Sequence, residues 1–223
     1  LGDFAPAGGP YASITPDVIN SPANQPLARK TATQAMVLLK NASNTLPLDA
    51  STTSRIAVVG PLADTLYTDW YSGALSYQVT PLDGIRQRLG RGATVVASEG
   101  VDRIALKEVT TGQYITAGTD ADGELLRIGS TTAGPAEQFD VFDWGQGILT
   151  LRSVANAKYV DRFNFGPNFA NRAAQPYDWF VQQQFRLEEQ SDGTVVIRYA
   201  GYEKAFDWAG PEVYLTVAAD GSV

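Results

Sequence analysis

Apolar residues in the first quarter of the chain recur at helical spacing. Four of them share one face of a helix over residues 27–40: Ala28, Ala32, Ala35 and Leu39. Asn24 precedes this segment as a candidate N-terminal cap, and Pro47 prevents the helix from continuing far beyond it. The pattern therefore predicts a helix over 27–40 whose small alanine side chains allow close approach to a sheet.

Two short apolar runs follow and have the character of buried strands. They cover residues 55–60 and 93–97, and a second amphipathic segment, Pro81 to Leu89, lies between them. Strand, helix and strand in this order predict a βαβ unit with parallel strands. Two strands do not make a stable sheet by themselves, so we expect further strands to complete it.

The second half of the chain contains an internal repeat of 45 to 46 residues. Each repeat begins with an apolar residue followed by Lys or Arg: Leu106-Lys107, Leu151-Arg152 and Ile197-Arg198. Eight residues after each apolar residue stand Tyr114-Ile115, Tyr159-Val160 and Ala205-Phe206. Alternating apolar and polar positions predict strands, and three such units predict a β-trefoil because propellers need about four to eight blades.

A second landmark of the repeat indicates where the trefoil stops. Gln138-Phe139 and Gln184-Phe185 lie 46 residues apart, so a third pair is expected near position 231, beyond Val223. We therefore expect the trefoil to lack its last strand. The repeated Lys107, Arg152 and Arg198 are predicted to have a structural role at strand starts.

Composition narrows the chemistry that the chain can perform. It has 17 basic and 24 acidic residues, a net charge of -7, which argues against nucleic acid as a partner. The absence of Cys and His excludes thiolate and imidazole catalysis, and we expect no metal and no cofactor. The longest fully apolar run is 35–39, far too short to span a membrane. The compartment stays open between the cytoplasm and secretion from a bacterium.

A polar, aromatic loop after the first predicted strand is the best candidate for ligand contact. It carries Asp69, Trp70, Tyr71 and Ser72. Ligands bind beyond the carboxyl ends of strands in open α/β sheets, where an aromatic ring stacks on a sugar and Asp or Ser bonds its hydroxyls. The structural alternative is that the two aromatic residues pack and Asp69 caps a turn.

Other residues with chemical potential have simpler structural interpretations. Glu99 and Asp102 are predicted to be turn residues at a domain boundary, beside Gly100. Trp144, Trp179 and Trp208 occupy different offsets in the repeats, so core or rim packing is favoured over equivalent binding pockets.

Residues 1–102 carry a set of motifs that resemble the start of the α/β-sandwich domain of glycoside hydrolase family 3. The motifs are, in order, LGDF at 1–4, AMVLLKN at 35–41, LPL at 46–48, IAVVGP at 56–61, DWYSG at 69–73 and VTPLDGI at 79–85. Residues 103–223 resemble a fascin-like trefoil inserted into that sandwich. The resemblance implies an α/β plus all-β fold: a connector over 1–26, a partial sandwich with its βαβ portion over 27–102, and a truncated trefoil over 103–223.

The resemblance implies a retaining, exo-acting enzyme that cleaves β-linked glucosides or xylosides. In that family the nucleophile is an Asp of a preceding barrel domain and the acid/base is a Glu later in the sandwich, so neither maps onto this sequence. We expect the isolated chain to be inactive and its partners to be a β-linked substrate and the remaining segments of the same enzyme. A non-catalytic carbohydrate-binding or interaction module built on the trefoil, and a spacer without a ligand, are the alternatives.

Overall fold

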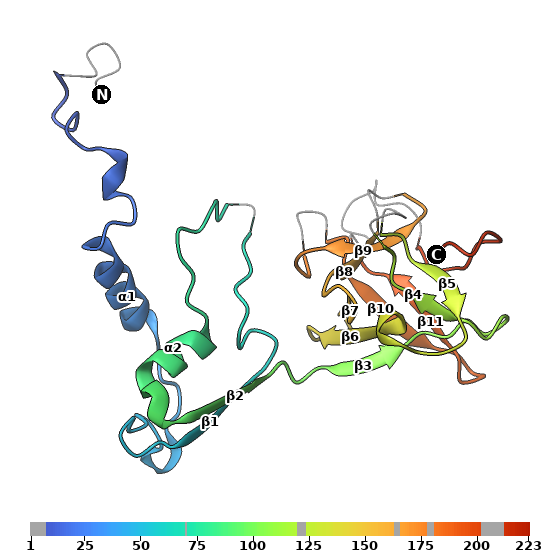
Figure 1. The fold of residues 1–223 in the computed structure, drawn as a ribbon, viewed down its shortest axis with the longest axis horizontal. Coiled ribbons are helices and arrows are strands. Elements are labelled where there is room, and N and C mark those ends of the chain that lie inside the picture. Colours follow the sequence, from blue (N-terminus) through green and yellow to red (C-terminus); the bar gives the residue numbers. More distant parts are fainter. Residues whose placement is uncertain (1–7, 70, 120–123, 163–165, 178–180, 202–211) are drawn as a thin grey trace. The chain divides into compact units, whose positions relative to one another are not determined.

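A computed structural model of the chain describes residues 8–69, 71–119, 124–162, 166–177, 181–201 and 212–223 (Figure 1). It divides into two compact units, one made of Leu1–Ser54 and Ala74–Gln78 and the other of Arg55–Gly73 and Val79–Val223. The described chain is mainly β-sheet with few helices.

In the described residues of the first unit, the one α-helix is α1 (Asn24–Ala35), and short 3₁₀ turns lie at Pro16–Val18 and Ala42–Asn44. The predicted helix over 27–40 is therefore wrong at both ends: Ala23 is the N-cap, and Met36 already has extended backbone angles. No residue of α1 is buried, and Leu39 is 92% exposed. Because helices in proteins gain most of their stability from packing, a helix without a buried face has little reason to continue past Ala35.

The second unit begins with the predicted βαβ element, β1 (Arg55–Val59), α2 (Pro81–Leu89) and β2 (Thr94–Ser98). β1 and β2 pair in parallel, which confirms the prediction. α2 begins at its predicted residue because Thr80 and Asp83 form a capping box, each side chain accepting a hydrogen bond from the other's backbone N–H. The 3₁₀ turn Gly90–Gly92 then leads into β2.

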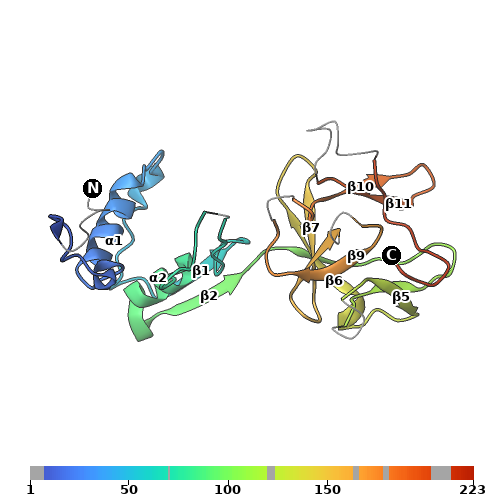
Figure 2. The same cartoon turned by 90° about the horizontal axis from the view of Figure 1, so that it is seen from above.

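The remaining strands form a seven-stranded antiparallel sheet and a separate hairpin (Figure 2). The sheet runs in the order β11 (Val195–Tyr199), β10 (Phe185–Glu189), β7 (Leu149–Ser153), β6 (Gln138–Asp143) and β3 (Asp102–Ala105). β8 (Tyr159–Arg162) pairs with β7 and with β9 (Phe169–Ala173). The hairpin consists of β4 (Tyr114–Thr116) and β5 (Arg127–Ser130), and the turn Pro135–Glu137 precedes β6.

A closed ring of backbone hydrogen bonds relates the three sequence repeats. The N–H of Leu126 donates to the carbonyl of Phe169, that of Phe169 to Val223, and that of Val223 to Leu126, at 2.8, 3.0 and 3.1 Å. All three side chains are buried in the same hydrophobic cluster. This cyclic exchange is the relationship expected around a pseudo-threefold axis.

The third repeat has a different register from the one the sequence predicts. Lys107 bridges Tyr114, and Arg152 pairs with Tyr159, whereas Arg198 bridges Tyr214. The alignment of Ala205-Phe206 with the two earlier tyrosines is therefore wrong. An ungapped comparison misses Tyr214 because the connection in the third repeat is longer, and residues 202–211 lie outside the described part of the chain.

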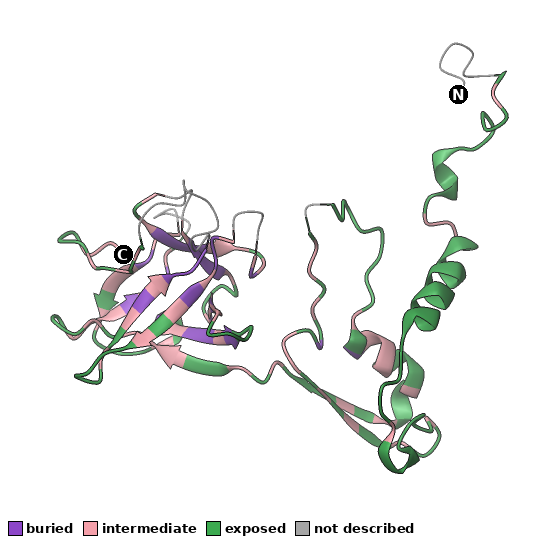
Figure 3. Cartoon of the chain, turned by 180° about the vertical axis from the view of Figure 1, so that it is seen from behind, coloured by how far each residue is buried: buried purple, intermediate pink, exposed green. Residues whose placement is uncertain are grey.

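Buried residues gather in the strands of the repeat region rather than in α1 (Figure 3). Phe139, Phe185 and Val160 are fully inaccessible, and Leu126 and Leu151 are each 1% exposed. The βαβ element contributes Leu82 of α2, which is 1% exposed and whose N–H donates to the Ala63 carbonyl. That bond fixes the loop after β1 against the start of α2.

Candidate functional site

The predicted ligand loop is an exposed turn held by Asp69. The Oδ1 of Asp69 accepts hydrogen bonds from the Tyr71 backbone N–H at 2.9 Å and from the Ser72 hydroxyl at 2.7 Å. The hydroxyl of Ser72 in turn accepts the Asp69 N–H. The bond from Ser72, with help from the Tyr71 backbone, holds the pKa of Asp69 below its usual value. Asp69 does cap a turn, as the structural alternative requires.

Of the two aromatic residues in this loop, the structure describes Tyr71 only. Tyr71 is 81% exposed, so it is not packed within the described chain. Trp70 lies outside the described residues. The structure therefore brings Asp69, Tyr71 and Ser72 together on one turn and leaves the tyrosine ring accessible to a ligand.

Immediately before that turn, the chain is fastened to the repeat region. The hydroxyls of Tyr67 and Tyr159 are 2.9 Å apart, and the carbonyl of Thr68 accepts bonds from the Tyr177 hydroxyl and the Gln175 amide at 2.9 and 3.0 Å. Burial, together with the bond to Tyr159, raises the pKa of Tyr67. Three hydrogen bonds thus anchor the two residues that precede Asp69.

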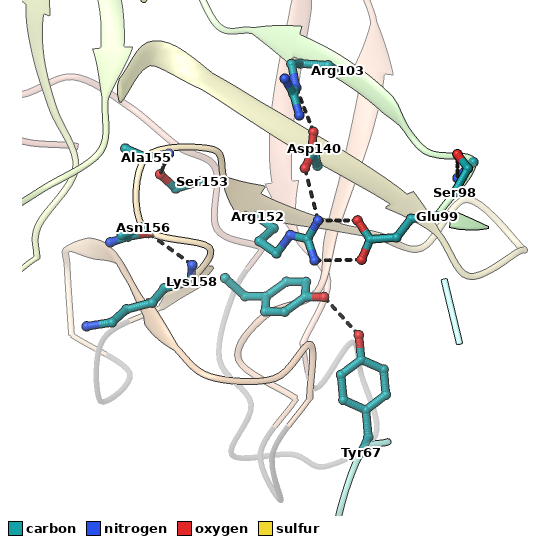
Figure 4. A network of polar contacts seen from close by, with 12 residues as sticks. Tyr67, Ser98, Glu99, Arg103, Asp140, Arg152, Ser153, Ala155, Asn156 and Lys158 are labelled. Carbon is teal, nitrogen blue, oxygen red and sulfur yellow. Dashed lines mark hydrogen bonds and ion pairs between the residues drawn. The ribbon is translucent and has the colours of Figure 1, made fainter. Parts of the chain in front are cut away.

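Arg152 is the centre of a polar network behind this anchor (Figure 4). Its guanidinium donates to both oxygens of Glu99, at 2.8 and 2.5 Å, and to Asp140 at 3.1 Å. It also lies over the rings of Phe142 and Tyr159, at 4.8 and 5.9 Å from their centroids. The Glu99 carboxylate raises the pKa of Arg152 further, so this cation is permanent.

Asp140 extends the network to a second arginine. Its carboxylate accepts a bond from Arg103 at 2.8 Å in addition to the one from Arg152. Burial alone would raise the pKa of Asp140, but the two guanidinium groups outweigh it and lower the pKa. Asp140 is therefore ionised and fully engaged as an anion between two cations.

The prediction of a plain turn residue is wrong for Glu99, because its carboxylate forms a bidentate pair with Arg152. Asp102 is the first residue of β3 rather than part of a turn. The structural role predicted for the repeated basic residues is confirmed at Arg152, and at Arg198, which donates to Glu188 at 2.5 Å. The sequence carried no signal for the pairing of Glu99, since its partner lies 53 residues away.

An aromatic cavity of about 650 Å³ adjoins the anchor. The rings of Trp144 and Tyr177 meet that of Tyr67 edge to face, with centroids 6.5 and 6.0 Å away. The remaining lining residues are Leu62, Thr65, Leu66, Pro81, Pro176 and Gln184. Trp144 stacks on Phe142 at its back, as rim packing predicts, while Trp179 and Trp208 lie outside the described residues.

The two carboxylates that contact Arg152 are engaged in ion pairs. Glu99 and Asp140 are both held by guanidinium groups. These groups lower the pKa of Asp140, whereas a general acid needs a carboxyl whose pKa is raised. Within the described ranges, no group of three or more Asp and Glu side chains is placed to hold a metal ion. No helix in that part of the chain is long and apolar enough to cross a membrane.

Residues 36–203 match the glycosyl hydrolase family 3 C-terminal domain. The chain belongs to glycoside hydrolase family 3. The family 3 match includes the loop at Asp69, the anchor at Tyr67 and the network around Arg152.

Several relatives of this family 3 chain carry glycosidase names. It is 34% identical to a probable β-D-xylosidase 7 of Arabidopsis thaliana over 66% of this chain and 20% of the relative. It is 38% identical to a periplasmic β-glucosidase of Salmonella typhimurium over 42% of this chain and 13% of the relative. The chain thus spans about a fifth or less of the length of these proteins.

Two solved structures resemble the family 3 chain. One is a designed threefold-symmetric protein, ThreeFoil, with a TM-score of 0.36 and 21% identity over 44% of this chain and 69% of that one. The other is the BEL β-trefoil in an apo crystal form, with a TM-score of 0.38 and 16% identity over 47% of this chain and 72% of that one.

Proposed function

We propose that this chain is part of a retaining, exo-acting glycosidase that removes β-linked glucose or xylose units. The observation that carries the proposal is the match of residues 36–203 to the family 3 domain, joined by relatives named as β-xylosidases and β-glucosidases. In this proposal the chain supplies substrate contacts, and the catalytic pair belongs to other segments of the same enzyme.

The chemistry of a retaining mechanism supports the proposal that the catalytic pair belongs to other segments. A retaining glycosidase needs two carboxyl groups about 5–5.5 Å apart, one a nucleophile and the other a proton donor. Two carboxylates of the polar network, Glu99 and Asp140, do not fit these roles, because each is bound to Arg152. Their carboxylate oxygens are occupied by hydrogen bonds from the guanidinium group of Arg152.

The proposed contribution of this chain is the sequence segment that carries Asp69, Trp70, Tyr71 and Ser72. Asp69 follows the carboxyl end of β1, stays ionised because its pKa is lowered, and is an acceptor for sugar hydroxyl groups. The exposed ring of Tyr71 is suited to stack on the C–H face of a sugar. The bonds to Thr68 and Tyr67 hold this turn in place.

We propose a matching domain organisation. Residues 1–26 connect to a barrel domain, 27–102 form part of an α/β sandwich, and 103–223 form a β-trefoil inserted into it. The parallel pair β1 and β2 supports the sandwich portion. The hydrogen-bond ring of Leu126, Phe169 and Val223 supports the trefoil.

The test is an assay of the whole enzyme that contains this chain, with 4-nitrophenyl β-D-xyloside and β-D-glucoside as substrates. Asp69→Asn and Tyr71→Ala are expected to raise KM about tenfold each, the loss of one charged hydrogen bond or one stacking contact. NMR of the first-formed sugar is expected to show the β-anomer. Unchanged KM in both variants would contradict the role of the turn, and an α-anomer would contradict retention.

A second candidate function is carbohydrate binding without catalysis by the trefoil. The aromatic cavity at Trp144 favours it, because three rings from distant parts of the chain converge there. The two candidates are compatible if the cavity serves the same substrate as the enzyme.

A further inference from the structure

We infer that the cavity lined by Tyr67, Trp144 and Tyr177 is a binding subsite for the pyranose rings of a β-1,4-linked oligosaccharide. The choice of sugar rests on the proposed function, whereas the existence of the site rests on the geometry of the cavity. Its volume of about 650 Å³ lies within the range of about 300–1,000 Å³ that is usual for small-molecule sites.

The polar atoms of the three rings point to what the cavity recognises. The Tyr67 hydroxyl is bonded to Tyr159, the Tyr177 hydroxyl donates to Thr68, and the indole N–H of Trp144 donates to Thr150 at 3.0 Å. The polar group of each ring therefore forms a hydrogen bond that holds the ring in place. The aromatic faces are the surfaces that a ligand would contact.

Two uncharged polar groups complete the lining. Within the described part of the chain, the Thr65 hydroxyl and the Gln184 side-chain amide have no hydrogen-bond partner. A purely apolar ligand would bury both groups without a hydrogen-bond partner, which disfavours such a ligand. Among the residues that the structure describes, the lining contains no Asp, Glu, Lys or Arg, which favours an uncharged ligand.

A neutral ring with apolar faces and polar edges satisfies both requirements. β-Linked glucose and xylose units carry their ring substituents equatorially, so both faces expose only C–H groups to aromatic walls. Their equatorial hydroxyls are then directed sideways, where an amide and a hydroxyl bond them. An α-linked glucan bends at each linkage and does not present the same flat, two-faced ribbon.

The test is isothermal titration calorimetry of the intact chain with β-1,4-xylotetraose and cellotetraose. We expect one of the two to bind, and Trp144→Ala and Gln184→Leu each to weaken that binding about fivefold or more. Tyr11→Ala removes an exposed ring from the other unit and is the matched control, expected to leave binding unchanged. Trp144 packs on Phe142, so Trp144→Ala could unfold the protein. In that case Gln184→Leu still tests the cavity.

The outcomes separate the site from the proposed function. No binding of either sugar, or binding that neither variant weakens, would overturn the subsite. Equal or tighter binding of 4-nitrophenol would overturn it in favour of an aromatic ligand. Tighter binding of maltotetraose that both variants weaken would keep the cavity as a sugar site but contradict the β-glycosidase assignment on which the choice of sugar rests.

Discussion

The hydroxyl of Tyr67 lies 2.9 Å from the hydroxyl of Tyr159, 92 residues further along the chain. Tyr67 stands two residues before Asp69, and Tyr159 lies in β8 with its ring under the guanidinium of Arg152. The bond therefore joins the proposed substrate turn to the polar network of the repeat region. A substitution at Tyr159 is therefore expected to alter the position of the turn at Asp69.

Removing this bond gives the first prediction. Tyr159→Phe leaves the Tyr67 hydroxyl half-buried without its partner and is expected to lower the free energy of unfolding by about 1 kcal/mol. Urea denaturation followed by tryptophan fluorescence measures the change. Tyr67→Phe with Tyr159→Phe is expected to be less destabilising than the sum of the single variants. Strict additivity would show that the two hydroxyls do not interact.

The second prediction concerns Arg152, whose substitution is expected to reduce the free energy of unfolding by a larger amount. Arg152→Lys retains a positive charge but loses the two-pronged contact with Glu99, and we expect a loss of about 2–3 kcal/mol in unfolding free energy. The control is Arg186→Lys, whose arginine donates to the Gln146 carbonyl at an exposed position, with an expected change below about 1 kcal/mol. A loss no greater than that of the control would show that the network contributes no stability.

The half-buried Tyr67 predicts that the stability of the fold depends on alkaline pH. The pKa of Tyr67 is raised above its ordinary value of 10.0, so the folded chain holds this proton more tightly than the unfolded chain. The resulting stabilisation is complete below about pH 10 and declines as the pH rises beyond it. Denaturation measured between neutral pH and about pH 11 is expected to show this decline, with a shallower slope in Tyr67→Phe. Equal slopes in the two proteins would refute the assignment.

The threefold ring gives a prediction about the core. Leu126 is 1% exposed, and Leu126→Ala is expected to destabilise the chain by about 2–5 kcal/mol through the lost burial and the remaining cavity. Leu187, in β10 and 37% exposed, supplies the matched control, since Leu187→Ala removes the same atoms from a half-exposed site. Equal losses in the two variants would mean that Leu126 is not part of a closed core.

The sequence predicts elements well where the determining contacts are local. α2 is found at Pro81–Leu89 as predicted, because its capping box lies within four residues of sequence. The helix predicted over 27–40 ends at Ala35, because an apolar stripe indicates a helix only if something packs against it. In the third repeat, Tyr214 takes the place predicted for Ala205, because a longer connection shifts the register and no local signal announces it.

In the candidate site, too, the local contacts can be predicted from the sequence, whereas the long-range contacts cannot. The turn at Asp69 is recognisable from its own residues. An Asp side chain that accepts hydrogen bonds from the residues two and three positions later, here Tyr71 and Ser72, is typical of turns. The cavity and the pairing of Glu99 depend on residues far apart in the sequence, since Glu99 and Arg152 are 53 positions apart. No periodicity in the sequence links Tyr67 with Trp144 and Tyr177. Such sites require the tertiary structure.

The most direct test of the central claim is the hydrolysis of 4-nitrophenyl β-D-xyloside and β-D-glucoside by the isolated 223-residue chain. Both catalytic carboxylates are proposed to lie in other segments of the enzyme, so we expect no release of 4-nitrophenol above the uncatalysed rate. Turnover of about 1 per second or faster, in the range of ordinary enzymes, would contradict this proposal.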